Sequence, residues 1–111
     1  MLDNHRVLND LCHEMDATRP TSIACYAVCG PFNKVAHLSD LVSWNLYLGW
    51  YVPGLFLNDL WIDFFHAKYP NRCLGYSEYG CEAMTNLHSS HPRRGDQTEE
   101  YQAIYHEYLL K

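Results

Sequence analysis

The sequence predicts an α/β protein built on a parallel sheet, and three observations indicate this fold class. Short apolar runs bounded by Pro and Gly alternate along the chain with segments whose apolar residues recur at helical spacing. Each run is apolar at nearly every position, as in strands that are covered on both faces. No internal repeat or linker interrupts the pattern, so we expect one α/β segment with right-handed crossovers over residues 1–111.

The N-terminal part of the chain predicts a helix followed by a strand. Asn4 is suited to cap a helix over about His5–Asp16, which ends before Pro20. The run Thr21–Val28 then predicts a buried parallel strand that ends ahead of Gly30. The apolar stripe of the helix consists of Val7, Leu8, Leu11, Cys12 and Met15.

The middle of the chain predicts a second strand, an aromatic loop and a second helix. The strand covers Asp40–Tyr47, and the loop with Trp50 and Tyr51 runs to Pro53. The following helix ends near Pro70. Its apolar face consists of Leu57, Leu60, Trp61, Phe64 and Phe65.

The run from Cys73 to Cys81 predicts a third buried strand, and it brings one carboxylate, Glu78, to its end. In α/β proteins ligands bind where the loops after the strands converge, so Glu78 is the candidate chemical centre. Glu82 is its rival, four residues later. Asp96 and Glu99 then form a capping-box-like pair before the last helix. The stripe of that helix consists of Tyr101, Ile104, Tyr105, Tyr108 and Leu109.

Composition excludes several classes of partner. The net charge of −5 disfavours binding to nucleic acid, because the overall field repels a polyanion. No apolar run approaches the roughly 20 residues that a membrane span needs, and the first residues lack a signal-peptide core. We therefore expect a cytoplasmic protein with no membrane partner.

The cysteines and histidines predict neither disulfides nor a metal site. The five cysteines are odd in number and mostly lie in apolar segments, which favours reduced thiols. The Cys25/Cys29 pair has no matching second pair, and His88 and His91 have no third ligand nearby in the sequence. We expect no metal and no cofactor.

Three ordered motifs resemble the catalytic domain of glycoside hydrolase family 2, which includes β-galactosidases and β-glucuronidases. They are Asn45-Leu-Tyr-Leu-Gly-Trp-Tyr51, Ser77-Glu-Tyr-Gly80 and Glu99-Glu-Tyr-Gln102, the last followed by Tyr105-His106. The resemblance covers nearly the whole chain. It implies a partial (β/α)8 TIM barrel, approximately strands 5–7 with flanking helices.

The same resemblance implies roles for two residues. Glu78 matches the catalytic nucleophile, and Tyr47 matches the tyrosine that hydrogen-bonds to that nucleophile and orients it. The general acid/base of the family is a glutamate in an Asn-Glu pair, and no such pair occurs in this sequence. Retaining glycosidases need two carboxyl groups, so we expect the chain alone to be inactive.

A sugar pocket is predicted around Glu78. Trp44, Trp50, Tyr51 and Tyr79 offer flat apolar faces with polar tips, and Asn45 can bind a hydroxyl group. Trp50 and Tyr51 are equally well explained by packing. For Asn45 and Tyr47 the less favoured alternative is that they end a strand by satisfying backbone groups.

Two functions remain open at this point. The first is a fragment of a retaining glycosidase that hydrolyses terminal β-galactosides, with Glu78 as nucleophile. The alternative is a non-catalytic carbohydrate-binding or assembly module. A chain that begins and ends on helices around three strands is expected to be a piece of a larger barrel. Its exposed sheet edges predict self-association, and its natural partner is the remainder of the barrel.

Overall fold

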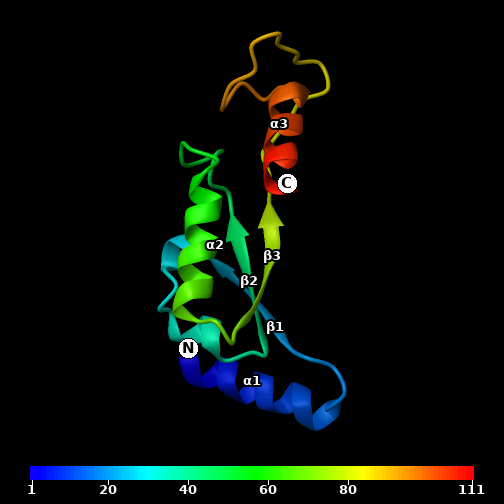
Figure 1. The fold of residues 1–111 in the computed structure, drawn as a ribbon. Helices are drawn as coiled ribbons and strands as arrows, with labels where there is room; N and C mark the ends of the chain where they lie inside the picture. The colour runs from blue at the N-terminus through cyan, green and yellow to red at the C-terminus, as the bar shows by residue number, and fades with distance from the viewer. The chain divides into compact units, whose positions relative to one another are not determined.

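The computed structural model describes all residues from Met1 to Lys111 and contains a three-stranded parallel sheet with helices. The strands lie in the order β1-β2-β3, as Figure 1 shows. This arrangement confirms the predicted α/β class. None of the helices is long and apolar enough to cross a membrane. The elements are α1 (Leu2–Met15), β1 (Ser22–Tyr26), β2 (Leu41–Leu46), α2 (Leu57–Lys68), β3 (Cys73–Tyr79) and α3 (Glu99–Leu109).

The residues form two compact units, and β2, α2 and β3 each run from one into the other. The first unit consists of Met1–Asn45 and Phe65–Ser77, and the second of Leu46–Phe64 and Glu78–Lys111. The first unit therefore contains α1, β1 and most of the sheet. The second contains α3 and the loop before it.

The first unit is organised around the central strand β2. β1 pairs with it in parallel, with register from Ser22↔Leu41 to Tyr26↔Asn45. Val42 and Trp44 of β2 are fully buried, and the Trp44 ring meets Phe65 of α2 edge-on with centroids 5.3 Å apart. An aromatic contact of this geometry adds about 0.5–1.5 kcal/mol to the apolar burial.

The second unit has its own aromatic core. Trp50, Tyr101 and Tyr105 are buried together, and the partly buried Leu55, Cys81 and Leu109 pack against them. Two of the three core rings come from α3, one turn apart, as the predicted apolar stripe requires. This core positions the end of β3 and the loop after β2.

The prediction that all strands are buried on both faces was wrong. Only β2 alternates between fully buried and half-buried positions, whereas β3 is exposed or half-buried along its whole length. The reason is the strand order, because β1 and β3 are the two edges of the sheet and only β2 has a neighbour on each side. The predicted strand at Thr21–Val28 also ends early, since Ala27–Cys29 form a 3-10 turn.

Both predicted helix caps were wrong, although both helices are present. α1 begins at Leu2 with Met1 at the N-cap, so Asn4 lies inside the helix. α3 is capped by Thr98, whose hydroxyl accepts a hydrogen bond from the Tyr101 amide at 3.2 Å. Asp96 instead accepts hydrogen bonds from Thr98 and Arg93, and so orders the turn before the helix.

Candidate functional site

Glu78 and Tyr47, the two candidate catalytic residues, are in direct contact in the second unit. Glu78 lies near the end of β3, and Tyr47 follows the last residue of β2. The Tyr47 hydroxyl donates a hydrogen bond to Glu78 Oε2. A bond from a neutral donor to a carboxylate is stronger than one between neutral groups, so it fixes the direction of the carboxylate. The catalytic roles of both residues stay predictions.

The two aromatic residues of the loop after β2 have different environments. Trp50 is only 7% exposed and belongs to the core of the unit, with its ring 6.1 Å from that of Tyr101. Tyr51 is 62% exposed and meets Tyr47 edge-on with centroids 5.4 Å apart. Trp50 therefore serves mainly to pack the core, whereas the exposed ring of Tyr51 is accessible to a ligand.

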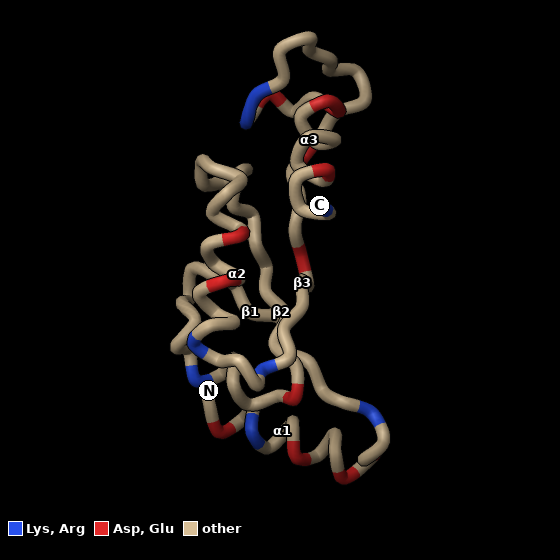
Figure 2. Tube along the Cα trace, in the orientation of Figure 1, with Lys and Arg blue, Asp and Glu red and all other residues tan.

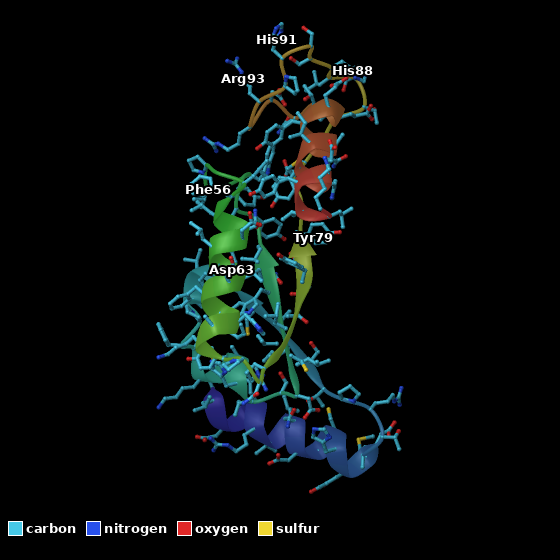
Figure 3. The ribbon with its side chains drawn as sticks, in the orientation of Figure 1. Phe56, Asp63, Tyr79, His88, His91 and Arg93 are labelled. Carbon is cyan, nitrogen blue, oxygen red and sulfur yellow. The ribbon has the colours of Figure 1, made fainter.

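A hollow of about 360 Å³ lies beside these residues in the second unit. Tyr79, at the end of β3 in Figure 3, contacts the ring of His106 edge-on at a centroid distance of 5.6 Å. Gln102 and His106 had no predicted site role, although both lie in the third family-like motif and its continuation. The hollow is lined by Tyr47, Trp50, Tyr51, Tyr79, Gly80, Cys81, Glu82, Gln102 and His106.

Two other predicted sugar-contacting residues belong to the first unit. Asn45 accepts a hydrogen bond from the Ser77 hydroxyl through its side-chain oxygen, at 2.5 Å. Trp44 is fully buried against Phe65, so its proposed role as an exposed sugar platform was wrong. The physical reason is the alternation along β2, which turns Trp44 into the core together with Val42.

Two groups of the second unit are kept neutral by the fold: Cys81, in the lining of the hollow, and Tyr105, in the core. Burial, with a smaller contribution from the Asp96 charge, raises the pKa of the Cys81 thiol to about 11. Burial likewise raises the pKa of the Tyr105 hydroxyl to about 12.

All five cysteines are free thiols. No group of three or more His, Cys, Asp or Glu side chains lies close enough to hold one metal ion.

These raised pKa values predict a loss of stability in alkaline solution. The ordinary pKa is 9.0 for a cysteine thiol and 10.0 for a tyrosine phenol, so in the unfolded chain both side chains ionise at a lower pH than Cys81 and Tyr105 do in the folded chain. The stabilisation is complete below pH 9 and is lost as the pH rises through 11 and 12. Urea unfolding at pH 8 to 11 measures it. Cys81→Ala should flatten the decline, whereas Cys12→Ala, at an exposed thiol, should not; equal slopes in all three chains would contradict the assignment.

Comparisons with known proteins identify relatives of the chain. No protein-family model matches the chain. It is 33% identical over 76 residues to a β-glucuronidase of Bacteroides fragilis, which aligns 68% of the chain with 10% of the relative. It is 29% identical over 89 residues to a putative β-glucuronidase of Formosa agariphila, which aligns 80% of the chain with 10% of the relative. Its homologues are glycoside hydrolases.

Solved structures give the same result over nearly the whole chain. An FMN-binding β-glucuronidase from F. prausnitzii L2-6 matches 97% of the chain at 45% identity with a TM-score of 0.92, over 17% of its own length. A Bacteroides uniformis β-glucuronidase matches 98% at 33% identity with a TM-score of 0.91, over 13% of its length. A putative β-galactosidase from Bacteroides fragilis matches 96% at 25% identity with a TM-score of 0.85, over 16% of its length. The chain thus spans about a tenth of the length of the curated relatives it matches.

Proposed function

We propose that the chain is a segment of a glycoside hydrolase family 2 catalytic barrel and supplies the nucleophile of a retaining glycosidase. The observation that carries this proposal is the hydrogen bond from Tyr47 to Glu78, which joins two of the family-like motifs. Residues 1–111 then correspond to about strands 5–7 of a (β/α)8 barrel. The similarity to solved β-glucuronidases over nearly the whole chain supports this assignment.

The proposed mechanism is a double displacement. The Glu78 carboxylate attacks the anomeric carbon, and the bond from that carbon to the leaving oxygen breaks as an ester to Glu78 forms. A second carboxylic acid, placed by the proposal outside residues 1–111, protonates the leaving oxygen. It then takes a proton from the water that hydrolyses the ester. Tyr47 holds the attacking oxygen in place, and Tyr51 offers an exposed face to the sugar ring.

A β-glucuronide is the substrate class that we favour. Both curated relatives and two of the three solved structures above are β-glucuronidases by name. The β-galactoside expected from the sequence stays the second candidate, and the putative β-galactosidase from Bacteroides fragilis supports it. A cytoplasmic location and the alternative of a non-catalytic carbohydrate-binding module remain predictions, and the latter would use the same hollow.

The proposal is tested by grafting the chain into an enzyme. Residues 1–111 replace the matching segment of the F. prausnitzii β-glucuronidase, which is 45% identical to them. We expect the chimera to hydrolyse 4-nitrophenyl β-D-glucuronide, and the isolated chain to show no turnover because it brings only one of the two carboxyl groups. A chimera that melts cooperatively but has no activity would count against the proposal, as would robust turnover by the isolated chain.

We also propose that the isolated chain self-associates. β1 and β3 are the edge strands of the sheet, and unpaired strand edges are templates for pairing with another chain. The apolar side chains of α1 are exposed as well, with Val7 at 65% and Met15 at 80%. Light scattering should give a mass above 13.0 kDa that grows with concentration. A monomer at all concentrations would rule this out.

A further inference from the structure

In the turn from Tyr47 to Tyr51, each of the first four backbone carbonyls accepts a hydrogen bond. The carbonyl of Tyr47 accepts from the amides of Trp50 and Tyr51, at 3.0 and 3.1 Å. The next three carbonyls each accept from a side chain that lies elsewhere in the second unit. Asn58 Nδ2 donates to Leu48 at 2.7 Å, the Tyr101 hydroxyl to Gly49 at 2.5 Å, and Arg94 Nη1 to Trp50 at 2.9 Å.

The three donors come from three segments, and only Arg94 comes from a loop. Asn58 lies in α2 and is fully buried, and Tyr101 lies in α3 and is 8% exposed. Both belong to the packed interior of the unit. Arg94 lies in the segment between β3 and α3 and reaches a carbonyl 44 residues away. Figure 2 shows a blue stretch, the colour of Lys and Arg, in the segment before α3.

The backbone of the turn is packed closely against its neighbours. Gly49 has φ 98°, and a Cβ at this position would lie 2.4 Å from Leu55 Cδ2, so the backbone fits closely against its neighbours. Tyr47, at the start of the turn, carries the phenol that donates a hydrogen bond to Glu78. The peptide unit that carries the Trp50 carbonyl also carries the Tyr51 amide, which donates a hydrogen bond to the Tyr47 carbonyl.

We propose that Arg94 is a positioning residue: by holding the Trp50 carbonyl it fixes this turn and keeps the Tyr47 phenol on Glu78. Its guanidinium is permanently charged, so its bond to a carbonyl is charge-assisted at all working pH values. The proposal deepens the proposed function and rests on it, because the hydrogen bond from Tyr47 to Glu78 bears on catalysis only when Glu78 is the nucleophile. Arg93 is the natural control, since its side chain carries the same charge and has no hydrogen bond to the turn.

Nuclear magnetic resonance on the isolated chain tests the proposal without any enzymatic activity. The chain carries tyrosine labelled with ¹³C at Cζ, and Tyr47→Phe identifies the Tyr47 signal. In Arg94→Gln that signal should move toward its position in Glu78→Gln, where the acceptor charge is gone. The amides of Trp50 and Tyr51 should exchange with solvent about tenfold faster, the effect of losing about one hydrogen bond.

Arg93→Gln removes the same charge from the same loop and should leave both readouts unchanged. Arg94→Lys keeps a cation and a donor, so its Tyr47 signal and its amide exchange rates should lie between those of wild type and Arg94→Gln. If Arg94→Gln does not fold, Arg94→Lys is measured in its place. An unmoved Tyr47 signal in a folded Arg94 variant would overturn the proposal, as would equal shifts in Arg93→Gln. Neither result depends on hydrolysis by the chimera, so failure of the proposed function is recognised separately.

Discussion

Replacing Glu78 with Gln should reduce hydrolysis of an aryl β-glucuronide by the chimera about 10³-fold or more. The amide is close in shape to the carboxylate, but it is uncharged and is a much weaker nucleophile toward the anomeric carbon. The covalent intermediate therefore does not form, and the loss should appear in kcat rather than in KM. Steady-state kinetics with 4-nitrophenyl β-D-glucuronide measure both parameters.

The matched control is Glu82→Gln, because Glu82 is the rival carboxylate and lines the hollow together with Tyr47. Its removal should change kcat less than about tenfold. Tyr47→Phe removes only the hydrogen-bond donor to Glu78, so its kcat should lie between those of Glu78→Gln and Glu82→Gln. A chimera that loses its activity with Glu82→Gln and keeps it with Glu78→Gln would exchange the roles of the two glutamates.

Tyr105→Ala should destabilise the second unit by about 3–5 kcal/mol, as expected for truncating a large buried aromatic side chain. Tyr105 is fully buried and shares the core with Trp50 and Tyr101. Leu55 and Cys81 pack against the same cluster, and a close-packed core relaxes only partly around a truncated side chain, so a cavity should remain. A domain of this size is commonly stable by only about 5–15 kcal/mol, so much of the second unit should melt.

Urea unfolding followed by circular dichroism measures this loss. Ile104→Ala is the control, since Ile104 precedes Tyr105 in the same helix and is 41% exposed. It should cost less than about 1 kcal/mol, because an exposed position leaves no cavity. Equal effects of the two substitutions would show that helix propensity, rather than the aromatic core, holds α3 in place.

Local patterns were sufficient to predict the type of every major element: apolar runs for the strands and helical spacing for the helices. Leu57, Leu60 and Trp61 recur at helical spacing and lie in α2, and Tyr101 and Tyr105 lie one turn apart in α3 and are buried. These patterns are local, because the pitch of a helix fixes which residues share a face. Helix ends were harder to predict. Asp96 and Thr98 are both good N-caps by composition, and only the backbone geometry selects Thr98.

Burial was predicted less well than element type. Cys73–Tyr79 is an apolar run by composition, yet it forms an edge strand whose residues are exposed or half-buried. The stripe of α1 is likewise apolar but contains no buried residue. An apolar pattern shows which face a segment can bury, and whether that face is covered depends on the neighbours that the fold supplies.

The sequence by itself determined the α/β class and the order of the elements, because both follow from local pattern. The family-like motifs also predicted the contact between Tyr47 and Glu78, which the structure contains. Only the tertiary structure decided which side chains meet across long separations in sequence. It buries Trp44 and Trp50, leaves Tyr51 exposed, and brings Arg94 to the Trp50 carbonyl. Such contacts depend on the path of a loop and on the packing of an entire core, and neither leaves a periodic signal in the sequence.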